Sequence, residues 1–292
     1  MCGICLNYTQ FDNINEPVRV LFVNSEMEHF MSSSPIATVG RFLPQGIQES
    51  GCEIRSFVPR YGTINERRYQ LHEVIRLSGM NIIINDIDRP LVIKVSSISA
   101  ARMQVYFIDN EDYFHRKFVY TDDEGNYFPD NDERAIFYAR GVLETVKKLR
   151  WKPDIIHCQG WISHFLPIYL KKVYHEDPIF TDSKVVLSLY SEGMDQVFSE
   201  NTRAKAIVPG IKNKDLEIIN PANGINLAKL AIQYSSGVIM GSEELPSEIM
   251  ETLSAGNVKV LPYRDINDPE YSYVQDYKIF YDQILGNNDK KV

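Results

Sequence analysis

A histidine, a glutamine and a tryptophan follow a short apolar run in the stretch KPDIIHCQGWISHFLP (152–167). Histidine can transfer a proton near neutral pH, glutamine can hydrogen-bond a hydroxyl, and tryptophan offers an aromatic face for stacking. An apolar run that leads into a polar loop and then into a helical pattern is typical of the carboxyl end of a strand in an α/β protein, where ligands bind. We therefore predict a ligand-binding loop at His157, Gln159 and Trp161.

Polar and aromatic side chains follow other predicted strands in the same way. Hydroxyls, amides and carboxylates can hydrogen-bond sugar hydroxyls, while aromatic rings can pack on the face of a sugar. The carboxyl ends of parallel strands meet at one edge of a sheet, so these side chains are candidates for a shared carbohydrate pocket. The alternative is that strand ends are polar only because they are loops. The candidates are Glu26, Tyr61, Asp109, Asn110, Tyr190 and Ser242.

The first residues, MCGIC, suggest an amidotransferase or a zinc site, but the rest of the sequence supports neither. Met-Cys-Gly-Ile begins amidotransferases whose cysteine becomes an amino-terminal nucleophile. That chemistry needs a long series of β-strands after the cysteine, whereas here strands alternate with helices. Cys2 and Cys5 form a C-x-x-C pair, but a structural zinc site needs four ligands and no second pair follows at metal-binding spacing. We expect no metal and no redox cofactor.

The elements that must position these residues follow an α/β pattern. Strand and helix patterns alternate, which predicts a Rossmann-like, mostly parallel sheet with helices on both faces. Residues 73–108 are rich in β-branched side chains and turn signals and predict an antiparallel β-hairpin insertion. Helices are predicted at 36–51, 131–151 and 271–286. The aromatic residues of the last helix predict packing against the domain, although an exposed aromatic stripe could bind a glucan or a partner.

Composition narrows the classes of partner. The 292 residues carry 31 basic and 39 acidic side chains, a net charge of −8, which argues against a general surface for nucleic acid or anionic membranes. No apolar run approaches the ~20 residues that span a membrane, and the first residues lack the features of a secretory signal. We expect a cytoplasmic protein with an amino-terminal extension (1–17), one domain (18–292) and four free cysteines.

Several long segments, in one order, resemble the family of bacterial glycogen synthases and plant starch synthases, which use ADP-glucose. The resemblance runs from about Val18 to Leu253 and implies the amino-terminal, acceptor-side half of a two-domain glycosyltransferase of the GT-B type. The segments that carry it are VLFVNSEMEHF (20–30), FVPRYG (57–62), VYFIDNEDYFHRKFVYTDDEGNYFPDNDERAIFYARGVLE (105–144), WKPDIIHCQGW (151–161) and INLAKLAIQYSSGVIMGSEELPSEI (225–249).

The sequence departs from this family at its phosphate-binding loop. In the family a Lys-x-Gly-Gly loop follows Ser-Glu-Met and meets the diphosphate of the donor. Two phosphates require a cation and bare backbone N–H groups. Here the loop reads Ser32, Ser33, Ser34 and Pro35, so the cation and both glycines are replaced and the proline lacks an N–H.

A second departure concerns the histidine that, in the family, lies against the transferred sugar. Gln159 stands at that position and cannot shift a proton as imidazole does. His157 and Trp161 match family residues that help to hold the loop. A third family loop, His-Asn, reads Tyr190-Ser191 here. We assign no catalytic residue.

These departures predict a glycogen/starch synthase-like protein of α-glucan metabolism that is non-catalytic alone, a glucan-binding or regulatory relative. The sequence leaves open whether the chain is an enzyme. We expect the chain to end soon after the first domain, so the alternative is a working ADP-glucose:α-1,4-glucan glucosyltransferase completed by a separate donor-binding chain or assembly. The expected ligands are a glycogen-like α-glucan and, more weakly, ADP-glucose, with neither nucleic acid nor membrane as a partner.

Overall fold

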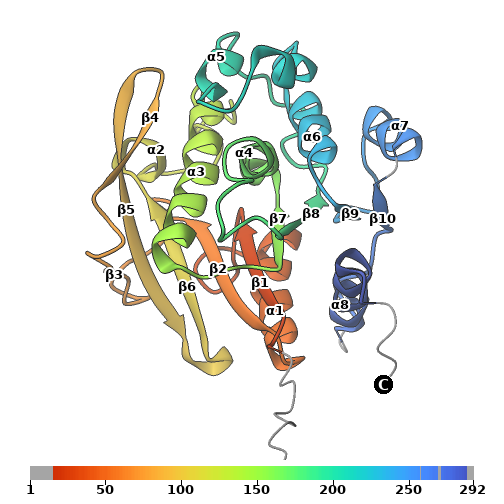
Figure 1. The fold of residues 1–292 in the computed structure, drawn as a ribbon. Helices are drawn as coiled ribbons and strands as arrows, with labels where there is room; N and C mark the ends of the chain where they lie inside the picture. The colour runs from red at the N-terminus through yellow and green to blue at the C-terminus, as the bar shows by residue number, and fades with distance from the viewer. Residues whose placement is uncertain (1–15, 257, 269–270, 288–292) are drawn as a thin grey trace, which may run out of the picture.

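A mixed β-sheet forms the centre of the computed structural model, which describes residues 16–256, 258–268 and 271–287 (Figure 1). Its strands lie in the order β10-β9-β8-β7-β1-β2-β6-β5-β3, and β4 pairs with β5. The strands are β1 (Arg19–Asn24), β2 (Glu53–Pro59), β3 (His72–Glu73), β4 (Met80–Ile84), β5 (Ile87–Ile98), β6 (Met103–Asp109), β7 (Ile155–Gln159), β8 (Lys184–Leu189), β9 (Gly237–Met240) and β10 (Lys259–Leu261).

Most neighbouring strands of this sheet are parallel. Every pair from β10 to β6 is parallel, whereas β5 pairs antiparallel with β6, β3 and β4. The antiparallel pairing predicted for residues 73–108 is therefore confirmed. Its last strand, β6, also joins β2 in parallel, so this strand belongs to the main sheet and the hairpin extends that sheet rather than standing apart from it.

Helices cover both faces of the sheet, as predicted, because both faces are apolar. They are α1 (Pro35–Glu49), α2 (Glu111–Phe114), α3 (Asn131–Leu149), α4 (Leu166–Lys172), α5 (Thr202–Ala206), α6 (Gly224–Gln233), α7 (Ser247–Ala255) and α8 (Ser272–Leu285), with 3₁₀ turns η1 (Ser99–Ala101), η2 (Trp161–Ser163) and η3 (Asn213–Ile219). Along β1, Leu21 and Val23 pack with the core that includes α3, α4 and α6, while Val20 and Phe22 pack with α1 and α8. This alternation follows from the two-residue period of a strand.

The sequence of α1 explains its position. Ser34 caps the helix by accepting from the Ala37 N–H at 3.1 Å, and Pro35 occupies the first turn, where its missing N–H costs nothing. Apolar residues then recur every three or four positions and face the sheet. The helix predicted at 36–51 is thus confirmed, as are those at 131–151 and 271–286.

Helix α8 packs back on the domain, as its aromatic pattern predicted. Tyr273, Tyr277, Phe280 and Tyr281 are buried against the face of the sheet that α1 also covers. The predicted amino-terminal extension, with Cys2 and Cys5, lies outside the described residues except for Glu16 and Pro17. Cys52 and Cys158 are buried free thiols.

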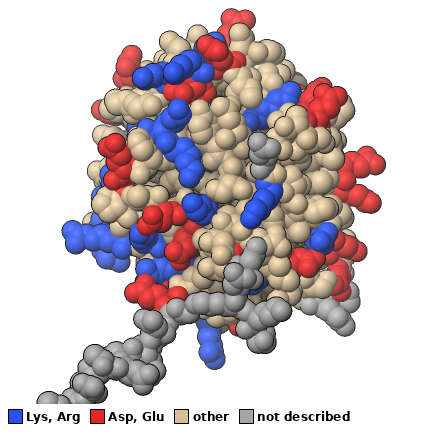
Figure 2. Space-filling model, turned by 45° about the vertical axis from the view of Figure 1, so that its right-hand side comes forward, with Lys and Arg blue, Asp and Glu red and all other residues tan. Residues whose placement is uncertain are grey.

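Charges of both signs are spread over the described surface. On the face drawn in Figure 2, lysine and arginine side chains alternate with aspartate and glutamate and leave tan areas between them. Among the described residues, no helix is long and apolar enough to cross a membrane.

Candidate functional site

The strand order changes direction at β1, so the carboxyl ends of β1 and β7 lie at the reversal of the sheet. The chain passes from β1 to β2 and β6 on one side, then returns to β7 and β8 on the other. In open α/β sheets, ligands bind outside the strand ends at such a reversal. Glu26, which follows β1, and the loop of Gly160 and Trp161, which follows β7, lie at this point.

Hydrogen bonds tie the loops after β1 and β7 together. The Ser25 N–H and the Ser25 hydroxyl both donate to the Gln159 carbonyl, at 2.9 and 2.7 Å. Gly160 adopts a positive φ of 81°, and a Cβ there would lie 1.9 Å from Ser25 Oγ. Only glycine therefore allows the β7 loop to approach β1 so closely.

Gln159, the last residue of β7, lies at this contact. Its side chain is buried and its amide donates to the Ile36 carbonyl of α1 at 2.7 Å. Its Oε1 has no hydrogen-bond partner of ordinary geometry within the described chain, and neither does the buried Tyr190 hydroxyl. Burial raises the pKa of Tyr190 well above its usual value, and the nearby Gln159 amide opposes part of that shift. The glutamine thus joins β7 to α1.

His157 is also held within the core. One ring nitrogen lies 2.7 Å from Ser188 Oγ and the other 2.7 Å from the Tyr281 hydroxyl of α8. Burial lowers the pKa of His157 to about 3, so the ring is neutral and needs one donor and one acceptor, which these two hydroxyls supply. The arrangement joins β7, β8 and α8.

The amino terminus of α1 faces Glu26. The Ser34 hydroxyl, which already caps the helix, donates to Glu26 Oε2 at 2.9 Å. Burial raises the pKa of Glu26, and the hydroxyls of Ser34 and Tyr120 oppose the shift. Ser33 donates to Glu28 Oε2 at 3.2 Å, so two serines of the predicted loop already bond carboxylates of this chain.

A cavity of about 610 Å³ opens beside this helix terminus. Among its lining residues, Arg68 is the one lysine or arginine, and its guanidinium packs over Tyr69, 5.3 Å from the ring centroid. The other lining residues supply hydroxyls, a carboxylate, aromatic rings and apolar side chains. These residues are Glu26, His29, Phe30, Met31, Ser32, Ser33, Ser34, Thr63, Tyr69 and Val119.

Glu192, which the sequence analysis did not select, adds a second carboxyl to the site. It follows β8 by three residues, and its side chain is exposed. Desolvation and the nearby charge of Glu26 raise the pKa of Glu192 to about 7. Its position after a strand end, like that of Glu26, is the signal that could have identified it.

Tyr61 and Trp161 form part of the aromatic floor below these carboxyls. Tyr61 is fully buried, its hydroxyl 3.5 Å from that of Tyr120. The Trp161 ring is 2% exposed and lies 5.2 Å from the ring of Tyr120. Tyr120 therefore connects the two predicted residues.

The remaining predicted residues lie at other strand ends and bond within the protein. Asp109 pairs with Lys94 at 2.9 Å and with His115 at 2.7 Å. Asn110 caps α2 and donates to the Pro90 carbonyl at 2.9 Å. Ser242 accepts from the Ser191 N–H at 3.0 Å, which joins the loops after β8 and β9. No group of three or more His, Cys, Asp or Glu in the described ranges is arranged to hold a metal ion.

The fold and the strand-end site define an α/β domain of Rossmann-like architecture, and comparison with known proteins gives its family. A family model described as the starch synthase catalytic domain matches residues 19–261. The chain belongs to this family, which confirms the resemblance to glycogen and starch synthases.

Curated relatives and a solved structure agree with this assignment. The chain is 41% identical over 174 residues to the glycogen synthase of Chlorobium limicola, covering 59% of this chain and 36% of that protein. It is 32% identical over 247 residues to the glycogen synthase of Chlorobaculum tepidum, covering 83% of this chain and 50% of that protein. The fold matches a solved structure, the catalytic domain of starch synthase IV from Arabidopsis thaliana bound to ADP and acarbose, with a TM-score of 0.64. The two sequences are 18% identical, and the match covers 76% of this chain and 44% of that one. The chain thus spans between a third and a half of the relatives it matches.

Proposed function

We propose that this chain is a cytoplasmic α-glucan-binding member of the glycogen/starch synthase family that does not transfer glucose on its own. The observation that carries the proposal is the hydrogen bond between Ser34 and Glu26, which places a carboxyl group at the amino terminus of α1. A helix terminus at this point of an α/β fold is otherwise a place for a phosphate.

Binding of a nucleotide diphosphate is disfavoured here for three reasons. Ser34 already accepts from the Ala37 N–H, and Pro35 has no N–H to offer. The Glu26 carboxyl repels a phosphate whenever it is ionised. Arg68 supplies a cation to the cavity, but its guanidinium packs over Tyr69. A donor such as ADP-glucose is therefore expected to bind weakly.

Proton transfer at the sugar is disfavoured as well. Gln159 stands where the resemblance places the family's histidine, and its amide is buried and bonded to the Ile36 carbonyl. We assign Gln159 and His157 to positioning the β7 loop rather than to contact with a sugar. Hydroxyls, carboxyls and aromatic rings around Glu26 and Tyr69 remain as a surface that suits a neutral polyhydroxylated ligand.

The second candidate function is a working ADP-glucose:α-1,4-glucan glucosyltransferase in which a second chain supplies the donor-binding half. The chain matches 36–50% of the length of the glycogen synthases cited above. The shared cleft would then form only in the assembly.

Transfer of labelled glucose from ADP-glucose to glycogen by the purified chain tests the first candidate, with glycogen affinity electrophoresis on the same sample. We expect retardation by glycogen and no transfer above a no-protein blank. Transfer by the chain alone would contradict the proposal. Transfer that appears only when a donor-binding half of a relative is added would favour the second candidate.

A further inference from the structure

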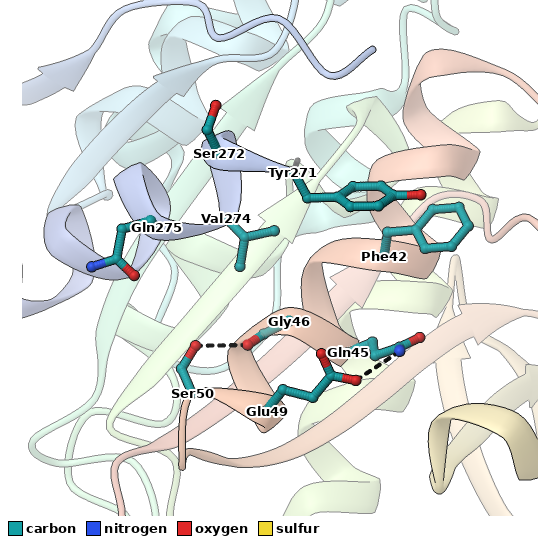
Figure 3. Close-up of a pocket in the computed structure, with 9 residues that line it drawn as sticks. All are labelled: Phe42, Gln45, Gly46, Glu49, Ser50, Tyr271, Ser272, Val274 and Gln275. Carbon is teal, nitrogen blue, oxygen red and sulfur yellow. Dashed lines mark hydrogen bonds between the residues drawn. The ribbon is translucent and has the colours of Figure 1, made fainter. Parts of the chain in front are cut away.

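A second groove lies between α1 and α8, away from the strand ends. It has a volume of about 470 Å³, within the range of small-molecule pockets, and shares no lining residue with the cavity beside Glu26 (Figure 3). Its residues come from the carboxyl-terminal half of α1 and from the first turn of α8 with the residue before it. The function proposed above does not use this groove.

Two aromatic rings form one wall of the groove. Phe42 and Tyr271 lie side by side with centroids 5.3 Å apart and planes inclined by 31° (Figure 3). Tyr271 is 43% exposed, whereas Tyr273 and Tyr277 of α8 are buried. Tyr271 also has a positive φ of 51°, a backbone conformation that aromatic residues seldom adopt. The Tyr271 ring thus lies partly exposed at the surface, although exposing apolar surface to water costs free energy.

Gln45 and Glu49 of α1 line the groove beside the rings, and Arg41, which lies outside the lining, bonds Gln45 from the preceding turn. Arg41 donates to Gln45 Oε1 at 2.8 Å, and Gln45 donates to Glu49 Oε1 at 2.7 Å. These bonds between residues four apart fix the orientation of the Gln45 amide and the Glu49 carboxyl beside the rings (Figure 3). Gln275 lines the groove from α8.

The close approach of the two helices sets the shape of the groove. A Cβ added at Gly46 would lie 2.6 Å from Val274 Cγ1, so glycine lets α8 pack directly on α1 at the base. The base of the groove thus lies between two helices that pack on the same face of the sheet.

The chemistry of the walls selects a class of ligand. Among the lining residues of the groove none is lysine or arginine, and Glu49 is the one acidic residue, so an anionic ligand is disfavoured. Aromatic faces beside amide, hydroxyl and carboxylate groups suit a neutral molecule that has apolar faces and many hydroxyls. Successive glucose units of an α-glucan have this character.

We propose that the α1–α8 groove is a second α-glucan-binding site, at which Tyr271 and Phe42 pack on a sugar face and Gln45 and Glu49 bond its hydroxyls. This inference rests on the function proposed above, since both require the chain to bind α-glucan. It adds an anchoring site that holds the glucan at a distance from the strand ends.

Retention of Tyr271→Ala in glycogen affinity gels tests the groove, with maltoheptaose binding by calorimetry as the second readout. Loss of the ring is expected to weaken both by about three- to tenfold, the size of one aromatic contact. Tyr271→Phe should keep wild-type binding. The matched control is Ile279→Ala, which removes a side chain of similar exposure from α8, outside the groove.

The outcomes separate the groove from the function on which it rests. If Tyr271→Ala binds glycogen and maltoheptaose as well as Ile279→Ala and wild type do, the groove is not a glucan-binding site, and the proposed function is unaffected. Wild-type chain that is not retained by glycogen at all would overturn both. Weakening by Tyr271→Ala with binding restored in Tyr271→Phe supports the groove.

Discussion

The two ends of helix α1 differ in whether their polar groups are closed off or open to a ligand. At the amino terminus, Ser34 and Glu26 close the helix with a hydrogen bond of the protein's own. Near the carboxyl terminus, Phe42 and Gln45 face an open groove without a lysine or arginine in its walls. A carboxyl group disfavours an anion at both ends, but the first end is closed by the protein's own hydrogen bond whereas the groove at the second is open. One helix thus combines a closed terminus with an open groove.

The largest expected effect concerns Arg134, a fully buried guanidinium below the strand-end cavity. It donates to the Tyr113 carbonyl, to Asn131 Oδ1 and to the Val119 carbonyl at 2.7–2.8 Å, and Val119 lines that cavity. Arg134→Met leaves these acceptors unpaired and should lower the free energy of unfolding by about 3–5 kcal/mol in urea denaturation. The exposed Arg76→Met is the control and should change it by less than about 0.5 kcal/mol. Equal losses of unfolding free energy in Arg134→Met and Arg76→Met would show that the bonds of the buried guanidinium do not stabilise the fold.

A pair of glycine substitutions compares the two regions directly. Gly160→Ala places a Cβ 1.9 Å from Ser25 Oγ on a backbone with positive φ, and should cost at least about 2 kcal/mol of unfolding free energy. Gly46→Ala also meets both methyl groups of Val274, at 2.6 and 3.1 Å, but it gains about 1 kcal/mol of helix propensity, so it should lose less than Gly160→Ala. Thermal unfolding of both variants measures the difference. A larger loss in Gly46→Ala would reverse the comparison.

Removal of the Glu26 charge tests the exclusion of phosphate. Glu26→Gln keeps a hydrogen-bond acceptor for Ser34 but takes away a repelling carboxylate, so ADP should bind about tenfold more tightly in calorimetry, a change of about 1.4 kcal/mol. Glu73→Gln, an exposed residue of β3, is the matched control and should leave ADP binding unchanged. Unaltered ADP affinity in Glu26→Gln would show that the carboxylate is not the barrier.

The smallest expected effect is a pH dependence from Glu192. Its pKa is raised from 4.5 to about 7, so between these pH values the folded protein holds a proton that the unfolded chain has released. Protonated Glu192 therefore stabilises the folded protein fully below about pH 4.5, and this stabilisation is lost as pH rises through 7. The side chain is exposed, so screening by water keeps the effect small. Glu192→Gln should flatten the stability profile between pH 5 and 8, and a profile with the same slope as wild type would refute the assignment.

Local patterns predicted much of the fold. The Ser-Pro start of α1 and its apolar repeat predicted a helix, and the aromatic residues of α8 predicted a buried face. The β-branched segment predicted antiparallel strands, but local sequence could not show that β6 would also pair with β2, because strand order is set by contacts across the whole chain.

The candidate site was harder to predict for the same reason. Gln159 bonds a carbonyl 123 residues away and His157 a hydroxyl 124 residues away, so their burial depends on how distant helices pack. The rings of Phe42 and Tyr271 meet only because α8 lies on α1. Residue type at a strand end predicted the place of the site, whereas tertiary packing decided which side chains reach it.

The contacts of α8 with the sheet, such as the hydrogen bond between His157 and Tyr281, also affect when the protein can fold during its synthesis. Val20 and Phe22, near the start of the described chain, share their core with Tyr273 and Tyr281 of α8, which lie more than 250 positions later in the sequence. Contacts of such long sequence separation slow folding, since a long loop must close before they form. This face of the sheet therefore stays incomplete on the ribosome until α8 has emerged, and chaperone binding to a nascent chain that stops before residue 271 is the expected consequence.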